Sequence, residues 1–260
     1  MVNVNLRWTS NIIACGKMCK FVDKLRNILQ IKQNRFNLAI ALLLFGATTL
    51  RKDAMTQERI EFFYDLSSPW TYLAFTNLFG VVERTDCSAR LRPVLVGGVF
   101  NAVNQSVYAA REANDNRKLK HSFHVLKDWS ALAGVEMNFP SQFHPAKSVN
   151  AMRMACTLAD DMPALTKFTR AAFESYFGAQ ENLDDLDVLV GVANRVGLDG
   201  DAMRANSQTD EVKALLRANT EEVIERGGYG SPTIFIDKTQ MYFGNDQLPL
   251  VEFALRRNPI

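Results

Sequence analysis

Two hydrophobic patterns meet between residues 59 and 97. Residues 59–66 (RIEFFYDL) are a short run of β-formers, which predicts a buried strand. Residues 69–85 carry apolar side chains three and four positions apart, which predicts a helix. Residues 89–97 (ARLRPVLVG) predict a second strand that ends at paired glycines. We therefore expect a βαβ unit here, with its two strands parallel.

A helical pattern covers residues 100–218. Several segments combine helix formers with apolar spacings of three and four, and Gly197 and Gly227 are typical of helix C-termini. The acidic residues of 182–187 (NLDDLD) suit the first turn of a helix, where they complement the helix dipole. We expect a helical block in this part of the chain.

The C-terminal part returns to β-formers. Residues 231–237 (SPTIFID) and 240–244 (QMYFG) predict a hairpin. Residues 245–257 predict a closing helix with Asn245 or Asp246 near its cap.

The order of these elements predicts the fold. A βαβ unit, a helical block and a ββα unit give an α/β protein with a four-stranded mixed sheet and helices on its faces. This is the thioredoxin-like fold with an all-helical domain inserted after the first βαβ unit. We expect residues 58–99 and 219–260 to form the thioredoxin-like domain and residues 100–218 to form the inserted helical domain.

Residues 1–54 differ from the rest of the chain in charge. They hold nine Lys/Arg and two Asp/Glu of the chain's 30 and 28, which leaves 21 basic and 26 acidic residues in 55–260. A mildly acidic body argues against nucleic acid as a partner, because phosphate binding needs a basic face.

Hydropathy also sets this N-terminal stretch apart. Residues 37–50 form an apolar run of about 14 residues, shorter than the ~20 needed to span a bilayer. We expect no stable membrane span and treat 1–54 as a basic extension outside the mature fold. A membrane anchor and an organelle-targeting peptide remain the alternatives.

The four cysteines and three histidines are scattered. Cys15 and Cys19 form a C-x3-C pair without the second pair of ligands that a zinc site needs. His121 and His124 can share a helix face but have no third ligand nearby. We predict free thiols and no metal site.

Candidate chemistry lies between the first strand and the first helix, in FFYDLSSPWTYLAF. Ser68 stands where a helix N-cap belongs, and Pro69 stands at the first helical position. The N–H groups of Trp70 and Thr71 then point toward the Ser68 hydroxyl, and the helix dipole adds about half an elementary charge. Such a corner suits an anion. Because it contains no cysteine, any thiolate bound here has to come from a ligand. A simple helix cap is the alternative.

A second segment, YGSPTIFI, adds weight to a binding site. In the thioredoxin plan a cis-proline begins this strand and faces the first helix, and Pro232 has that place. Ser231 then offers free backbone groups to a bound peptide. Gly244 gives a tight turn, the N–H groups of Asn245 and Asp246 suit a carboxylate, and the Asp246 side chain suits an ammonium. A small peptide with a thiol, an ammonium and a carboxylate fits this site, and glutathione is such a peptide.

Four segments carry a family resemblance: FFYDLSSPWTYLAF, LRPVLVGGVF, NFPSQFHPAKSVNAMR and RGGYGSPTIFIDKTQMYFGNDQLPLVEFAL. From about residue 58 to the C-terminus the chain resembles the kappa-class glutathione transferases, and most of all their bacterial 2-hydroxychromene-2-carboxylate isomerase branch. This family belongs to the DsbA-like thioredoxin superfamily. The resemblance implies glutathione as cofactor, a small aromatic or electrophilic substrate, a homodimer and a bacterial cytoplasmic location.

The resemblance also implies roles where the motifs match. It makes Ser68 the catalytic residue that holds the glutathione sulfur as a thiolate, with Pro69 and Trp70 lining the thiol end of the site. It places the backbone of Ser231, before Pro232, against the cysteinyl part. The other implied ligands are Asn104 at the glycine end, and Asn245 and Asp246 at the γ-glutamyl end.

The implied reaction is the cis–trans isomerisation of an aromatic hydroxychromene carboxylate or benzylidenepyruvate in the catabolism of aromatic compounds. A kappa-type transferase and a non-enzymatic glutathione or peptide binder are the alternatives. SPWT at 68–71 argues against a disulfide oxidoreductase, which needs C-x-x-C there. Ser67 is a weaker rival to Ser68. The segment 106–115 and Lys147 depart from the family pattern and affect the second-substrate pocket more than the glutathione site.

Overall fold

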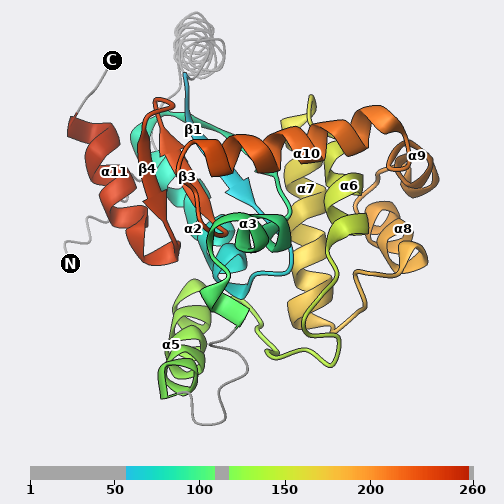
Figure 1. Ribbon diagram of the computed structural model, residues 1–260, viewed down its shortest axis with the longest axis horizontal. Helices are drawn as coiled ribbons and strands as arrows, with labels where there is room; N and C mark the ends of the chain where they lie inside the picture. The colour runs from blue at the N-terminus through green and yellow to red at the C-terminus, as the bar shows by residue number, and fades with distance from the viewer. Residues whose placement is uncertain (1–56, 109–116, 258–260) are drawn as a thin grey trace, which may run out of the picture. The chain divides into compact units, whose positions relative to one another are not determined.

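The computed structural model describes residues 57–108 and 117–257, shown in Figure 1. The sheet has the order β2-β1-β3-β4. Its strands are β1 (Glu58–Tyr64), β2 (Ser88–Pro93), β3 (Thr233–Ile236) and β4 (Gln240–Phe243). Strand β1 pairs parallel with β2 and antiparallel with β3, which pairs antiparallel with β4. The predicted four-stranded mixed sheet is therefore confirmed.

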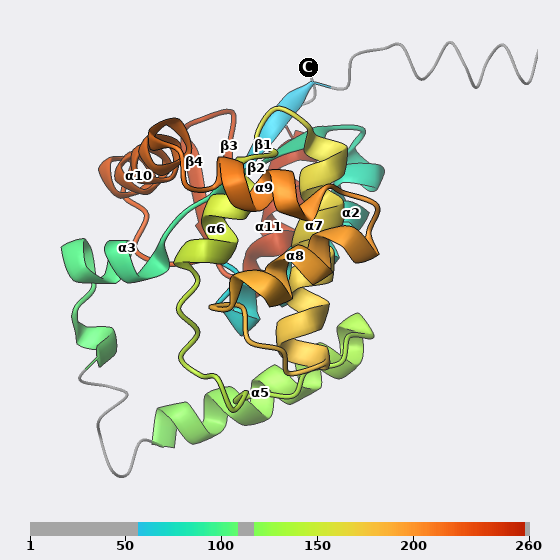
Figure 2. The same ribbon diagram turned by 90° about the vertical axis from the view of Figure 1, so that its right-hand side faces the viewer.

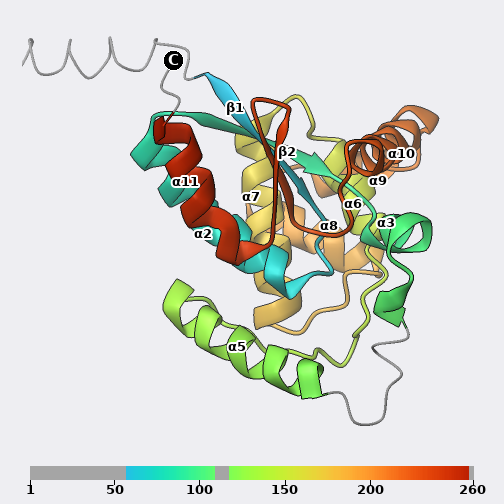
Figure 3. The same cartoon turned by 60° about the vertical axis from the view of Figure 1, so that its left-hand side comes forward.

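Strand β1 is buried on both faces because its side chains enter two hydrophobic clusters. Phe62 and its neighbours of the same parity join the larger cluster, which includes residues of helices α2 (Pro69–Thr85) and α11 (Leu248–Arg257). Phe63 joins a smaller cluster on the opposite face. This cluster includes Val99 of helix α3 (Val96–Val103) and Val223 of helix α10 (Asp210–Glu225). Figure 3 shows α2 and α11 side by side against the sheet.

The second strand ends earlier than predicted. We expected it to run to residue 97, but β2 ends at Pro93 and helix α3 starts at Val96. Its parallel partner β1 ends at Tyr64, opposite Pro93, so the β-formers after Pro93 have no strand to pair with. After Pro93, the backbone N–H of Val94 donates one more hydrogen bond to the Tyr64 carbonyl, at 2.9 Å.

The predicted helical block is present. Beyond α3 it contains α5 (Arg117–Ala133), α6 (Val149–Cys156), α7 (Met162–Phe173), the π-helix η1 (Glu174–Gly178), α8 (Leu186–Arg195) and α9 (Gly200–Asn206), followed by α10. Helices α6 to α9 are grouped together in Figure 2. Gly197 and Gly227 have φ values of 78° and 92°, as helix stops require, and Asp185 caps α8.

The helical block and the thioredoxin-like part share one hydrophobic core. The ring centroids of Phe75 in α2 and Phe173 in α7 lie 5.5 Å apart, and both residues belong to the larger cluster. The predicted boundaries near residues 99 and 218 remain a prediction, and α10 runs across the second one.

The C-terminal helix begins later than predicted. Residues 245–257 were expected to form one helix, but a 3-10 turn, η2 (Asn245–Gln247), comes first and α11 starts at Leu248. Pro249 is therefore the second residue of α11, a position where its missing N–H removes no helical hydrogen bond.

Three further predictions concern thiols, metals and membranes. Cys87 and Cys156 are free, as predicted, and both are buried; burial raises the pKa of Cys156 to about 12. Cys15, Cys19 and the whole extension 1–54 lie outside the described residues. Within the described part, no group of three or more His, Cys, Asp or Glu can hold a metal ion, and no helix is long and apolar enough to cross a membrane.

Candidate glutathione site

Ser68 caps helix α2. Its backbone is extended (φ −97°, ψ 119°), and its hydroxyl oxygen accepts a hydrogen bond from the Thr71 N–H at 3.2 Å. Pro69 occupies the first turn, where no N–H is required. The predicted junction is confirmed as a capped helix start that directs positive potential toward the half-buried Ser68 side chain.

The loop before β3 lies directly against this helix start. The Ser231–Pro232 peptide bond is cis, as expected from the fold. The Ser68 hydroxyl donates to the Ser231 carbonyl at 3.1 Å, and the Ser231 hydroxyl lies 2.8 Å from the Thr71 hydroxyl. The expectation that the Ser231 carbonyl is free was wrong, because Ser68 is close enough to donate to it.

Asp65 is the main residue that sequence reasoning missed. It is fully buried and accepts hydrogen bonds from both the N–H and the hydroxyl of Ser67, each at 2.8 Å. It also accepts from the Val96 N–H at 2.8 Å and the Ser148 hydroxyl at 3.0 Å. Burial raises the pKa of Asp65, although these four hydrogen bonds act in the opposite direction. An aspartate at the end of an apolar strand was the available signal.

This arrangement also separates Ser67 from Ser68. The Ser67 hydroxyl donates to the buried Asp65 carboxylate at 2.8 Å, whereas the Ser68 hydroxyl sits at the N-terminus of α2. The backbone N–H of Asp65 also donates a hydrogen bond to the Ser231 hydroxyl oxygen at 2.8 Å. Asp65 thus joins the Ser67–Ser68 turn, the start of α3 and the cis-proline loop.

The larger cavity at this corner has a volume of about 840 Å³. Five of the candidate site residues line it: Ser68, Pro69, Trp70, Asn104 and Ser231. The Asn104 amide donates to the Tyr229 carbonyl at 3.0 Å, which ties α3 to the cis-proline loop.

A second cavity, of about 420 Å³, adjoins the first. It shares Trp70, Ser231 and Phe243 with the larger cavity. The remaining three candidates, Pro232, Asn245 and Asp246, line it as well. The structure therefore brings all eight predicted site residues to two adjoining cavities.

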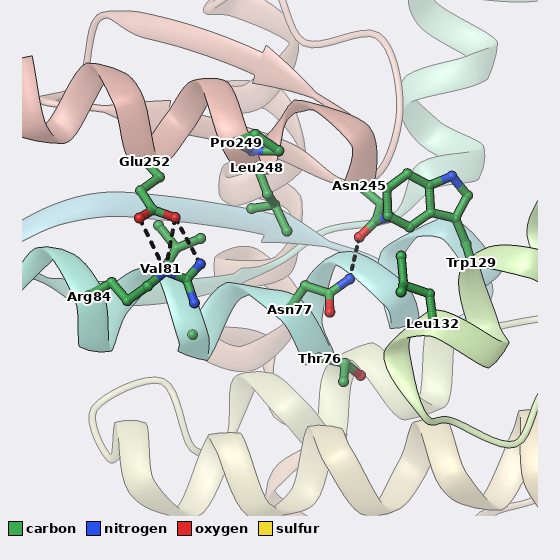
Figure 4. A pocket seen from close by; sticks show the side chains of 11 residues that line it. Thr76, Asn77, Val81, Arg84, Trp129, Leu132, Asn245, Leu248, Pro249 and Glu252 are labelled. Carbon is green, nitrogen blue, oxygen red and sulfur yellow. Dashed lines mark hydrogen bonds and ion pairs between the residues drawn. The ribbon is translucent and has the colours of Figure 1, made fainter.

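Asn245 has an unusual environment in the second cavity. It is only 2% exposed, and its side-chain oxygen accepts a hydrogen bond from the Asn77 amide at 2.9 Å, visible in Figure 4. Its amide nitrogen is buried and has no hydrogen-bond partner. An unpaired buried donor of this kind costs about 1–3 kcal/mol. The prediction from sequence used only the backbone N–H of Asn245.

Trp129 and His144 also line the cavities, and neither was among the candidates. Trp129 extends from α5 beside Asn245, as Figure 4 shows, and contributes to the smaller cavity. His144 lies in the loop before α6 and contributes to the larger one. Neither position follows from local sequence, because each depends on how the helical block packs against α2. Lys147, which departs from the family pattern, is exposed, and its Nζ atom lies 3.8 Å from Oδ2 of Asp184.

The sheet order, the cis-proline and the capped helix start define a thioredoxin-like protein. Residues 59–256 match the family described as the DSBA-like thioredoxin domain, and the chain belongs to this family.

Relatives within this family confirm the resemblance. The chain is 28% identical to a 2-hydroxychromene-2-carboxylate isomerase of Sphingobium xenophagum, over 75% of this chain and 97% of that protein. It is 27% identical to glutathione S-transferase kappa 1 of Rattus norvegicus, over 75% and 90% of the two chains. The relatives thus include isomerases and kappa-class transferases.

Solved structures show the same fold. A 2-hydroxychromene-2-carboxylate isomerase superposes with a TM-score of 0.63 at 22% identity, over 76% of this chain and 94% of that one. The cytosolic disulfide reductase DsbM from Pseudomonas aeruginosa, solved with GSH, gives a TM-score of 0.52 at 17% identity, over 76% and 98%.

Proposed function

We propose that this protein is a glutathione-dependent isomerase in which Ser68 holds the glutathione sulfur as a thiolate. The proposed substrate is an aromatic hydroxychromene carboxylate or benzylidenepyruvate. The observation that carries the proposal is the meeting of all eight candidate residues at two adjoining cavities. Relatives named as isomerases and kappa-class transferases support glutathione chemistry.

The residues present fit glutathione along its length. Asn245 and Asp246 line the smaller cavity, where their backbone N–H groups suit the γ-glutamyl carboxylate and the Asp246 carboxylate suits the ammonium. Ser231 and Pro232 lie between that end and Ser68, where the cysteinyl part belongs. Asn104 lies on the larger cavity, on the side assigned to the glycine end.

The protein's contribution to reactivity is electrostatic. When bound, glutathione supplies a thiolate that adds to a conjugated double bond and leaves after rotation in an isomerase, or stays attached in a transferase. Ser68 turns its hydroxyl from the Ser231 carbonyl to the sulfur, and the N-terminus of α2 favours the negative charge. Each tenfold gain in thiolate requires about 1.4 kcal/mol, within reach of one hydrogen bond to a charged group plus the dipole.

The test replaces Ser68 by alanine. Ultraviolet absorbance of bound glutathione reports the thiolate as a function of pH, and an aromatic enone reports turnover. We expect a higher thiol pKa and a loss of turnover of about 100-fold or more, since the hydroxyl and the thiolate act together. Ser67→Ala is the matched control, because the Ser67 hydroxyl donates to Asp65. An unchanged thiol pKa and unchanged turnover in Ser68→Ala would refute the mechanism.

Two alternatives are separated by the same assay. Release of a glutathione conjugate from the enone identifies a kappa-type transferase, while glutathione binding without any turnover identifies a non-enzymatic binder. The homodimer, the role in aromatic catabolism and the cytoplasmic location stay predictions from the family resemblance.

A further inference from the structure

Part of the lining of the larger cavity is aromatic. It includes Phe100, Tyr108, Phe123 and Phe139. The Phe123 and Phe139 rings lie 5.5 Å apart at 72°, and the Phe100 and Tyr108 rings lie 6.3 Å apart at 89°. Surfaces of this kind receive a planar apolar ring. The second substrate therefore has space beside the thiol end of the glutathione site.

His144 also lines this cavity. Among the described residues that line it there is no Lys, Arg, Asp or Glu, and His144 is the one histidine. An imidazole also donates an N–H in either neutral tautomer. An anionic oxygen that enters this cavity can therefore accept a hydrogen bond from His144.

The position of His144 is fixed by its surroundings. Its ring packs edge-on against Phe139, with centroids 4.8 Å apart at 76°, and its backbone N–H donates to the Ser141 carbonyl at 2.9 Å. Four residues later, the Ser148 hydroxyl donates to Asp65, which also holds the Ser67–Ser68 turn. The same buried carboxylate therefore holds the segments that carry His144 and Ser68.

We propose that His144 donates a hydrogen bond to an oxygen of the aromatic second substrate that carries negative charge. This inference rests on the proposed function. As the C–S bond forms, the π electrons of the double bond move onto the carbonyl oxygen, and they return when the bond breaks. His144 keeps its proton throughout. The oxygen that it contacts is either this carbonyl oxygen or a substrate carboxylate, since both are acceptors of the same kind.

The experiment uses two variants of the full chain. His144→Phe removes the donor but keeps a ring against Phe139, and His144→Gln keeps an N–H donor. His124→Gln is the control, since His124 is 72% exposed on α5. The probes are benzylidenepyruvate and its methyl ester, and the glutathione dissociation constant is measured separately in every variant.

We expect His144→Phe to lower kcat/KM for benzylidenepyruvate by about 10- to 100-fold, as loss of a hydrogen bond to a charged group does. His144→Gln should recover most of it, with glutathione affinity within twofold of the wild type. A loss confined to the acid identifies the carboxylate as the acceptor, and an equal loss with the ester identifies the carbonyl oxygen. Both results support the proposal.

Three outcomes would overturn the assignment of His144. They are a His144→Phe change within twofold, a His144→Gln loss as large as that of His144→Phe, and a parallel loss of glutathione affinity. A wild-type protein that binds no glutathione would instead refute the proposed function, and this inference with it. The two failures are therefore distinguishable.

Discussion

Replacing Asp65 by alanine tests how the site is held together. The side chain is fully buried and accepts four hydrogen bonds, two from Ser67, one from Val96 and one from Ser148. Alanine leaves all four donors without their acceptor. Ser67 is half-buried, so water can replace the carboxylate at its two donors.

Val96 is half-buried as well, so the magnitude follows mainly from the Ser148 hydroxyl, whose residue is buried. A buried donor that loses its acceptor costs about 1–3 kcal/mol. Removing a buried carboxylate, whose pKa burial raises, offsets part of this cost. We expect Asp65→Ala to lose about 2 kcal/mol of unfolding free energy, or about 6 °C in Tm for a protein of this size.

Urea unfolding of the full chain measures this change. Asp128→Ala is the matched control, because Asp128 is 70% exposed and only approaches His124 at 3.6 Å; its effect should stay within about 0.5 kcal/mol. At a temperature where Asp65→Ala is folded, its kcat/KM should also fall, since Ser68 follows the turn that Asp65 holds. A stability loss below about 1 kcal/mol, or one equal to that of the control, would refute this account of Asp65.

Two further predictions concern stability. Tyr64→Phe should cost about 1 kcal/mol in urea unfolding, because the buried Tyr64 hydroxyl lies 2.7 Å from the Thr169 hydroxyl; an unchanged or higher midpoint would contradict this. Arg84 and Arg256 hold the pKa of Glu252 at about 2, below its usual 4.5, so their stabilisation is complete above pH 4.5 and is lost as the pH falls toward 2. Glu252→Gln should reduce the change in unfolding free energy over this pH range by about 0.2–1 kcal/mol, since both arginines are more than half exposed. Curves that superimpose would exclude this role.

Much of the fold could be read locally. The apolar run of β1, the Ser68 cap with Pro69 behind it, and the glycine stops at Gly197 and Gly227 all depend on residues close in sequence. The end of β2 could not be read in this way. Val94 and Val96 are good β-formers, and they leave the sheet because β1 has already ended.

The candidate site divides in the same way. The sequence determined a hydroxyl at the start of a helix and a proline before a strand, because capping and proline geometry are satisfied within a few residues. Only the tertiary structure decided that Asp65 holds four donors, that the amide of Asn245 is buried without a partner, and that His144 lines the cavity of Ser68. Those properties are set by burial and by partners up to 168 residues away, as between Asn77 and Asn245, and a local pattern carries no record of them.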